Sequence, residues 1–439
     1  LLEAVRRLEQ KPVLVYPSCY DEKTEVLTKD GWKKYNELTL DDEFLTLNPD
    51  TGEMEYVKPL DIVIANYSGP MYHFTGKSID LLVTPNHKMF AKTARKWKLI
   101  EAEELARHSV FEFKTDGIWN GERREFIEIP EADYPEELKY KPSKYEKALE
   151  LRKRGMQYKE IAEILNISIN TLEWWFSRTR KKSPLFYRRV NSTKRRKIMM
   201  NDFLEFLGYY LTDGHLRKRD HIVEITQKKK ENLEKIESCM KRVSEQLGTP
   251  LRVYKDKNGT YHFMIRDFGF WKYLRENVGR LKHEKKIPRE LLQLHRDQLL
   301  ILFNALMLGD GAKRGDSFAT CSKELADQML ELALKCGYSA ILREKKPREV
   351  VYNGRKIKGK RITYTVYIKR ERLTPYIHCK NRCKNKPVTV ENYNGIVWCP
   401  VLPKNHIVYV RRNGNCVWSG NSLNSLYGYP PGTVFKEDT

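Results

Sequence analysis

The sequence has no long apolar run, no secretory signal at its start and few cysteines, and each absence argues against a class of protein. No stretch of about 18 uninterrupted apolar residues occurs, so the sequence predicts no membrane-spanning helix. Its opening residues, Leu1–Glu9, follow an amphipathic helical pattern instead of a secretory one. Eight cysteines in 439 residues do not make a secreted disulfide framework. We therefore expect a soluble, intracellular protein.

The cysteines leave one metal alternative, a structural zinc site. Four thiols lie in the C-terminal part of the chain: Cys379, Cys383, Cys399 and Cys416. The first two form a short pair, but the later spacings are long and contain no second short pair, unlike most structural zinc sites. The sequence therefore does not favour zinc.

Acidic residues are in the minority. The chain has 81 basic and 58 acidic residues, a net charge of +23, which is natural for a protein that binds the phosphate backbone of nucleic acid. A single basic run can also be a solvated face, but the sum of the runs favours nucleic acid as a partner. The runs lie at residues 178–182, 194–197 and 228–230.

Two positions near opposite ends of the chain carry residue types suited to breaking a peptide bond. Cys19 offers a thiol nucleophile, and Asn421 offers a side-chain amide that can cyclise, next to the Ser422 hydroxyl. Short β-rich runs at 25–28, 43–47 and 80–84 alternate with turn signals between residues 19 and 135. This segment is expected to be a small all-β fold.

Five segments of the chain resemble the splicing blocks of inteins: residues 19–28, residues 82–90 with a Thr-x-x-His motif, residues 97–105, Asn405–His406 and residues 418–422. The resemblance implies a Hint-type β fold and self-excision without a cofactor. Cys19 would attack the carbonyl of Ser18 to form a thioester, with Thr84 hydrogen-bonding nearby and His87 donating a proton to the departing nitrogen. Ser422 would then attack the thioester, and Asn421 would cyclise to release the element.

Two positions depart from the intein pattern. Gly420 stands where inteins commonly have His, so help for Asn421 must come from elsewhere, and His406 is the candidate. Gly420 can alternatively permit a backbone geometry that favours cyclisation. Cys399 stands where the family usually has Asp, and it can tune the pKa of Cys19, act as a second nucleophile or only pack.

A helical segment follows the first β-rich part. Helical runs at 145–152, 158–165 and 171–176 flank Gly155 and the Asn166-Ile167-Ser168 turn, and they resemble a helix-turn-helix domain whose third helix enters the major groove. An ordinary helical connector is the alternative. The candidate DNA contacts are Ser168, Asn170, Thr171 and Arg178.

Two apolar helical runs, 203–214 and 299–311, both end in Asp-Gly. Small residues at matching positions, Gly208 with Ala305 and Thr212 with Gly309, would let the two helices pack closely. Asp213 and Asp310 would then lie side by side and repel each other unless a cation lies between them. We expect Mg²⁺ there, because a divalent metal also activates water for phosphodiester hydrolysis.

These runs resemble the signature helices of LAGLIDADG homing endonucleases, over roughly residues 200–385. The resemblance implies cleavage of a long, asymmetric duplex site, with strands such as 362–368 forming DNA-facing saddles. It places the metal at Asp213 and Asp310, beside Gly214 and Gly311. For the assisting lysines it implies Lys285, then Lys286, in the first half, and Lys369 or Lys386 in the second.

Together these patterns predict a multidomain protein with an all-β Hint-type splicing domain, a small helical domain and an α+β two-repeat nuclease. We expect a monomer that acts on its host flanks in cis, does not bind membranes, and comes from the cytoplasm of a prokaryote, with the Lys, Arg and Glu content favouring a thermophilic archaeon. A Hedgehog-like autoprocessing domain and a DNA-binding regulator without nuclease activity are the alternatives. The expected parts are 1–18 (host flank), 19–135 (splicing), 136–192 (helix-turn-helix), 193–387 (nuclease), 388–421 (splicing) and 422–439 (host flank).

Overall fold

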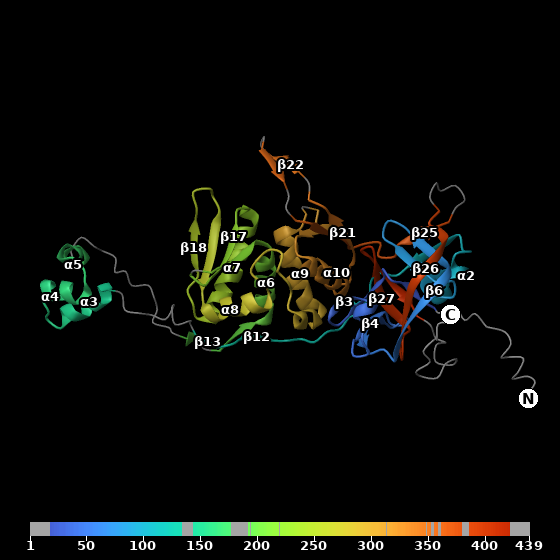
Figure 1. The fold of residues 1–439 in the computed structure, drawn as a ribbon, viewed down its shortest axis with the longest axis horizontal. Coiled ribbons are helices and arrows are strands. Elements are labelled where there is room, and N and C mark those ends of the chain that lie inside the picture. Colours follow the sequence, from blue (N-terminus) through green and yellow to red (C-terminus); the bar gives the residue numbers. More distant parts are fainter. Residues whose placement is uncertain are drawn as a thin grey trace, which may run out of the picture.

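The structure is a computed structural model of a multidomain chain. It describes residues 18–133, 144–176, 192–193, 195–218, 220–312, 314–347, 349–352, 355–358, 361–379 and 386–421. We call its three parts the β unit (18–119 with 376–379 and 386–421), the three-helix unit (144–176) and the αβ unit (122–133 with 195–369) (Figure 1). In the described part of the chain, no helix is long and apolar enough to cross a membrane.

The β unit is built from short strands and two long ones. A closed barrel joins β1, β26, β6 and β7, and the long strands β6 and β26 pair along their whole length. Apolar side chains of these strands fill a core that includes Tyr20, Phe74 and Trp398. The strands expected at 25–28, 43–47 and 80–84 are confirmed as β2, β4 and β7. The elements are β1 (Tyr20–Asp21), β2 (Glu25–Thr28), β3 (Gly31–Lys34), β4 (Phe44–Leu47), β5 (Glu53–Val57), β6 (Asp61–Thr75), β7 (Asp80–Val83), β8 (Lys88–Thr93), β9 (Lys96–Glu101), α2 (Ala102–Leu105), β10 (Val110–Phe113), β11 (Ile118–Trp119), β25 (Tyr376–His378), β26 (Val388–Val401), β27 (Ile407–Arg412) and β28 (Asn415–Gly420).

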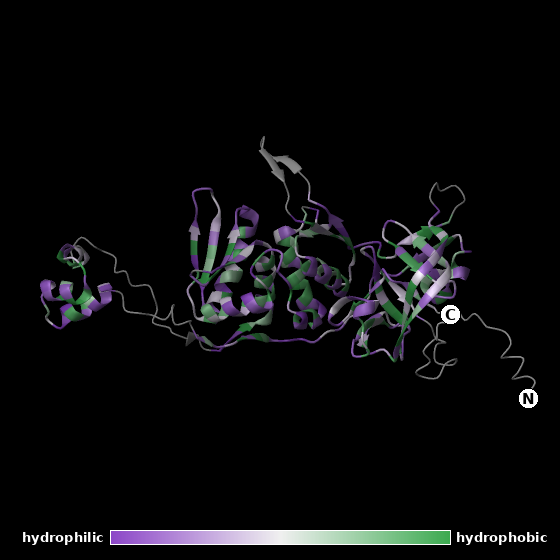
Figure 2. Cartoon of the chain, viewed as in Figure 1, coloured by the Kyte–Doolittle hydropathy of each residue, from purple (hydrophilic) through white to green (hydrophobic). Residues whose placement is uncertain are grey.

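The αβ unit is organised around two long helices, each followed by strands. Helix α6 ends at Asp213 and helix α9 at Asp310, and apolar residues are concentrated along both helices (Figure 2). A four-stranded sheet follows α6 in the order β16-β17-β19-β18, and β20, β24 and β21 follow α9. The elements are β12 (Phe126–Ile129), β15 (Arg196–Met199), α6 (Met200–Asp213), β16 (Gly214–Arg217), β17 (Ile222–Gln227), α7 (Lys230–Leu247), β18 (Arg252–Lys255), β19 (Tyr261–Arg266), α8 (Phe268–Asn277), α9 (Arg296–Asp310), β20 (Ser317–Thr320), α10 (Lys323–Lys335), β21 (Ser339–Lys345), β22 (Glu349–Tyr352), β23 (Arg355–Lys358) and β24 (Thr363–Lys369).

The close packing expected for the two Asp-Gly helices is confirmed. A Cβ added to Gly208 would lie 2.4 Å from the Cβ of Ala305, and one added to Gly309 would lie 2.1 Å from the Thr212 hydroxyl oxygen. Because any larger side chain would separate the helices, these glycines set the distance between α6 and α9. The two aspartates are thereby brought to the same end of the helix pair.

The β unit and the αβ unit share one sheet and one hydrophobic core. The ten-stranded sheet runs in the order β11-β5-β4-β2-β27-β28-β21-β24-β20, with its tenth strand, β3, paired to β2 beside this path. The sheet passes from one unit to the other between β28 and β21. A single cluster of buried side chains includes Leu45, Trp119 and Trp418 from the β unit and Phe303 and Leu330 from the αβ unit. The two units therefore form one folded body in this region.

The strand pairings place the unit boundaries differently from the expected ranges. Strand β12, inside the range 19–135, pairs with β15 of the αβ unit. Strand β25, inside the range 193–387, pairs with β10 of the β unit. The physical reason is that an edge strand joins whichever sheet offers it unpaired backbone groups, and a sequence pattern does not identify that partner.

The three-helix unit contains the helices expected from the sequence, α3 (Lys144–Lys153), α4 (Tyr158–Leu165) and α5 (Ile169–Phe176). Helix α4 ends at Asn166, whose φ of +50° is the left-handed conformation that asparagine tolerates. The Ser168 hydroxyl accepts a hydrogen bond from the Thr171 amide at 3.2 Å and so starts the third helix. The core is small and includes Ala148, Ile161 and Leu172.

Candidate functional site

The first candidate centre lies at the start of the barrel, around Cys19. The amide nitrogen of Cys19 donates a 2.8 Å hydrogen bond to the Thr84 hydroxyl, and the Thr84 amide donates to the Cys19 carbonyl at 3.1 Å. Strand β1 begins directly after Cys19 and pairs with β7, which ends directly before Thr84. The fold thus brings a thiol and a hydroxyl 65 residues apart to the two sides of one peptide bond.

His87 contacts residues from both candidate splice junctions. Its Nδ1 lies 3.5 Å from the Ser18 hydroxyl and its Nε2 lies 3.1 Å from the Ser419 hydroxyl, two residues before Asn421. Complete burial lowers the pKa of His87 to about 3, against the opposing effect of a hydrogen bond to the Ser18 backbone. The imidazole is therefore neutral at physiological pH. Thr84 is the side chain that contacts the Cys19 nitrogen here, so proton donation by His87 stays a prediction.

A second thiol lies beside Cys19. Cys399 of β26 is in hydrogen-bonding contact with Cys19, and the two belong to one small apolar cluster. Burial raises the pKa of the Cys19 thiol well above its ordinary range, and Cys399 raises it further. Cys399 also approaches the Pro400 carbonyl at 3.5 Å. Cys399 thus both raises the pKa of Cys19 and packs against it. Its use as a second nucleophile stays a prediction.

Asn421 is fully buried at the end of β28. Its amide nitrogen donates to the His406 carbonyl at 3.0 Å, and its side-chain Nδ2 donates to the Pro400 carbonyl at 2.8 Å. Its Oδ1 is buried without a hydrogen-bond partner among the described residues. His406 therefore contacts Asn421 through its backbone in this state. Ser422 lies outside the described residues.

Gly420 occupies a place where no side chain fits. A Cβ at this position would lie 2.2 Å from the carbonyl oxygen of Lys88 in β8, and the Gly420 carbonyl accepts a 2.6 Å hydrogen bond from the Tyr20 hydroxyl. The common histidine of inteins is thus excluded by the close approach of two backbones. Tyr20 and Ser419 lie inside the segments 19–28 and 418–422 that resemble splicing blocks, but the sequence assigned neither of them a role.

The second candidate centre lies where α6 and α9 end. Burial raises the pKa of Asp213 and of Asp310, and the charge of Asp310 raises that of Asp213 further. Gln227 donates to Asp213 at 3.1 Å. A cavity of about 190 Å³ opens beside Asp310 and is also lined by Thr212, Lys282 and Cys321. Asp213 is partly buried and Asp310 is exposed at its helix end. Two neighbouring carboxyl groups that disfavour shared negative charge fit a divalent cation, although the described residues contain no cluster of three or more His, Cys, Asp or Glu side chains that could hold one.

The predicted lysines are distributed unevenly. Lys285 is buried and its Nζ donates to the carbonyls of Tyr210 (2.5 Å), Leu211 (3.2 Å) and Gly214 (2.7 Å), which end α6. Burial lowers the pKa of Lys285 to about 7, against the opposing effect of Asp310 and Asp213.

The remaining lysines lie elsewhere. Lys286 faces Glu324 at 3.9 Å, Lys369 bonds Ser78 of the β unit, and Lys386 is exposed before β26. Two exposed lysines, Lys282 and Lys229, lower the pKa of both aspartates along with Lys285. Lys229 belongs to the basic run 228–230, but no sequence pattern indicated a role at this centre for either lysine.

Among the predicted DNA contacts, Ser168 and Asn170 are exposed at the start of α5, and Thr171 is bonded to Ser168 by a 2.8 Å hydroxyl contact. Arg178 lies outside the described residues. Gly311, expected beside the metal, forms a bridge with Phe318 of β20. The DNA-contact and metal assignments stay predictions.

Known families and proteins match parts of this chain. A family model for sigma-70, region 4, matches residues 142–182. The chain is 25% identical over 343 residues to an ATP-dependent Clp protease proteolytic subunit of Chlamydomonas moewusii (74% of this chain, 28% of the relative). It is 26% identical over 448 residues to a DNA-directed RNA polymerase subunit beta C-terminal section of Stigeoclonium helveticum (93% of this chain, 36% of the relative). The chain thus spans about a third of the length of these relatives.

Solved structures also resemble parts of it. A splice-inactive variant of the AceL NrdHF class 3 split intein is 28% identical with a TM-score of 0.21 (22% of this chain, 63% of that chain). A variant of the homing endonuclease I-DmoI is 14% identical with a TM-score of 0.29 (40% and 85%). A bacterial intein-like domain from Clostridium thermocellum is 18% identical with a TM-score of 0.19 (22% and 66%). Parts of this chain are thus similar to inteins and to a homing endonuclease.

Proposed function

We propose that this chain is a self-splicing element that excises residues 19–421 and joins Ser18 to Ser422. The supporting observation is the placement of His87, whose two ring nitrogens lie next to Ser18 at one junction and Ser419 near the other, 332 residues from His87. Splicing requires the two junctions to meet, and a buried histidine between them is a shared contact.

The proposed first step is attack by the Cys19 sulfur on the carbonyl carbon of Ser18. The carbon–nitrogen bond breaks, a thioester forms, and the Cys19 nitrogen takes up a proton while Thr84 holds it at 2.8 Å. Since burial keeps the pKa of the Cys19 thiol high, the thiol must lose its proton during the attack.

The later steps use the other end of the chain. Ser422 would attack the thioester and take the upstream flank onto its oxygen, while the carbon–sulfur bond breaks and the Cys19 thiol is regenerated with the proton of the Ser422 hydroxyl. Asn421 would then attack its own carbonyl carbon through Nδ2, which must first leave the Pro400 carbonyl. This closes an imide ring and frees the Ser422 nitrogen, onto which the acyl group moves from oxygen to nitrogen.

The test is to substitute Cys19→Ala and Asn421→Ala and to determine the product masses. We expect the double variant to remain a precursor, while the unaltered chain yields an excised element and joined flanks. Joined flanks of correct mass from the double variant would rule out the proposed chemistry.

We further propose that the αβ unit cleaves double-stranded DNA with Mg²⁺. The supporting observation is the convergence of Asp213 and Asp310 at the end of two closely packed helices in a chain of net charge +23. Asp213 and Asp310 would hold the metal, which supplies an activated water and a stabilised leaving oxygen. The test is cleavage of DNA carrying the joined-flank coding sequence. Asp213→Asn should abolish cleavage, whereas a lack of cleavage by the unaltered chain with any divalent ion would contradict the proposal.

A further inference from the structure

The αβ unit contacts one hairpin of the β unit, formed by β27 and β28, at its turn. Ile341 of β21 pairs with Asn415 of β28, and the Leu342 amide donates to the Gly414 carbonyl at 2.8 Å. Arg343 adds two side-chain contacts to the same turn, to the Asn413 carbonyl at 3.3 Å and to the Asn415 side chain at 2.8 Å. Three successive residues of the αβ unit thus hold the start of β28.

A buried ion-pair network holds the other strand of the same hairpin. Arg411 of β27 is 2% exposed, and its guanidinium donates to both Glu25 carboxylate oxygens at 2.8 and 2.9 Å. It also donates to Asp327 of α10 at 2.6 Å. A buried guanidinium stays charged, so loss of one carboxylate partner would leave its charge less well compensated. Asp327 of the αβ unit therefore completes a site inside the β unit.

The β27–β28 hairpin is followed directly by the proposed C-terminal junction. Strands β27 and β28 pair from Arg412↔Asn415 to Ile407↔Gly420, and Asn421 follows. Ser419 of β28 carries the hydroxyl that contacts His87. The N-terminal junction also has contacts of its own, because Cys19 is bonded to Thr84 and the strand that follows it pairs with β26 and β7. Its contacts with the hairpin, Asp21 with Arg412 at 3.0 Å and Tyr20 with the Gly420 carbonyl at 2.6 Å, do not involve the αβ unit.

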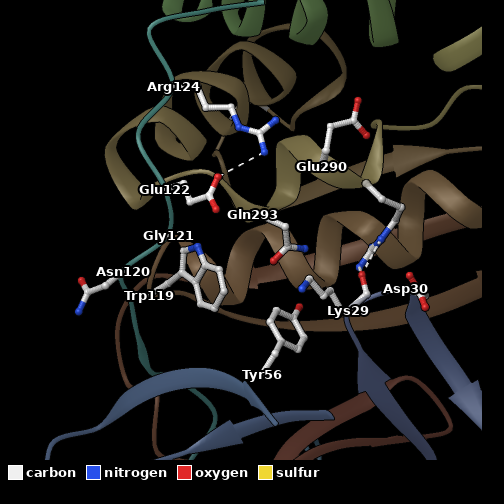
Figure 3. A pocket seen from close by; sticks show the side chains of 11 residues that line it. Lys29, Asp30, Tyr56, Trp119, Asn120, Gly121, Glu122, Arg124, Glu290 and Gln293 are labelled. Atoms are coloured by element: carbon white, nitrogen blue, oxygen red, sulfur yellow. Dashed lines mark hydrogen bonds and ion pairs between the residues drawn. The ribbon is translucent and has the colours of Figure 1, made fainter. Parts of the chain in front are cut away.

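The seam between the units also contains a pocket. A cavity of about 540 Å³ lies there, lined by Tyr56 and Trp119 from the β unit and by Gln293 from the segment before α9 (Figure 3). Contact across the seam is not confined to the hairpin. Glu331 of α10 accepts a hydrogen bond from Tyr56 at 3.1 Å, and the Trp119 indole donates to the Leu294 carbonyl at 2.9 Å. The hairpin is the contact that continues to Asn421.

We propose that Asp327 and Arg343, which belong to the αβ unit, are positioning residues of the splicing reaction. They hold the β27–β28 hairpin in the register that places Ser419 beside His87 and Asn421 beside the Pro400 carbonyl. The nuclease part is then a required component of the C-terminal splice centre, and not an independent insertion. This inference rests on the proposed splicing function.

The test compares the two junctions in the full chain. Asp327→Asn and Arg343→Gln are each expected to slow Asn421-dependent cleavage at least tenfold, while thiol-induced cleavage between Ser18 and Cys19 changes less than twofold. The conservative Arg343→Lys should recover part of the rate. Glu324→Gln is the matched control, because Glu324 lies on α10 one turn from Asp327 and is exposed. It should cleave normally at both junctions.

Hydrogen exchange of residues 415–421 provides a readout that does not depend on splicing. The two variants should exchange faster there than the unaltered chain, with unchanged circular dichroism. Normal C-terminal cleavage with unchanged exchange would overturn the proposal, as would an equal slowing of both junctions, which indicates general destabilisation. Intact precursor from the unaltered chain, with faster exchange in the variants, would instead refute splicing itself and leave the positioning contact supported.

Discussion

At the scale of single residues, the groups proposed for splicing are neutral before the reaction. Burial holds the pKa of the Cys19 thiol high and lowers that of His87 to about 3. A neutral imidazole donates one hydrogen bond and accepts one, so it can contact both junctions without a buried charge. The proton must therefore move during the reaction, and a slow first step is the expected consequence.

His87 makes the stability of the fold depend on pH. Its folded pKa of about 3 lies below the ordinary value of 6.5, so the unfolded chain binds a proton first as the pH falls. The free energy of unfolding should therefore be highest above pH 6.5 and decrease between pH 6.5 and 3. From pH 7 to 5 the loss assigned to His87 is about 2 kcal/mol. Denaturant unfolding of the Asn421→Ala precursor, with and without His87→Gln, measures this free energy at each pH. The same dependence on pH in both proteins would contradict the prediction. His283→Gln, at the surface, is the control.

Gly420 makes a second residue-level prediction. Gly420→His, which introduces the residue common in inteins, should slow C-terminal cleavage because its Cβ would lie 2.2 Å from the Lys88 carbonyl oxygen. Gly420→Ala should show the same effect more weakly, since it adds only the Cβ. Time courses of product mass check both variants. Faster cleavage by Gly420→His would show that the β8–β28 approach is not limiting.

At the scale of elements, the α6–α9 pair determines the geometry of the proposed nuclease centre. The helices approach closely because glycine lies opposite Ala305 and Thr212. Lys285 then binds the last carbonyls of α6, which orients the helix end next to Asp213. The small residues of the sequence motif thus set the distance between the two helices. That distance also sets how far apart the carboxyl groups of Asp213 and Asp310 lie.

Gly309→Val tests this distance. The new side chain would overlap Thr212, and overpacking of this kind costs about 1–3 kcal/mol. We expect a lower midpoint of thermal unfolding and loss of DNA cleavage, because Asp310 follows directly. Asn304→Ala, on an exposed position of the same helix, is the control and should retain both properties. Full cleavage by Gly309→Val would contradict the role of close packing.

At the scale of the whole molecule, a shared sheet and core combine the centres proposed for splicing and for DNA cleavage in one body. Strand β20, whose Thr320 lines the cavity beside Asp310, belongs to the same ten-stranded sheet as β28. The net charge of +23 is that of the whole chain, so it acts on any DNA that approaches either unit. Long-range attraction to phosphate is therefore a property of the whole chain, and salt should weaken DNA binding steeply.

The three-helix unit should add affinity and not catalysis. Asn170→Ala removes an exposed side chain at the start of α5, and a lost base contact costs about 1–3 kcal/mol. We expect a dissociation constant about tenfold higher on duplex DNA, measured at fixed salt, with an unchanged cleavage rate at saturating protein. Glu163→Ala on the exposed face of α4 is the control. An unchanged dissociation constant would favour a plain helical connector.

Local patterns predicted much of the fold because they depend on neighbouring residues. The strands at 25–28 and 80–84, the three helices of 144–176 and both Asp-Gly helices follow from periodicity and turn signals, and the structure confirms them. The partners of β12 and β25 did not follow, since unpaired strand edges are filled by whatever lies nearby in space.

The sequence by itself determined which residue types lie at the two proposed junctions, the two carboxyl groups and the excess of positive charge. These follow directly from the identity of each residue and from its spacing along the chain. Only the tertiary structure decided that Ser419 lies at His87, that no side chain fits at position 420, and that Asp327 completes the charge pair of Arg411. The physical reason is that such contacts join residues tens to hundreds of positions apart, and their distances depend on how closely two backbones pack.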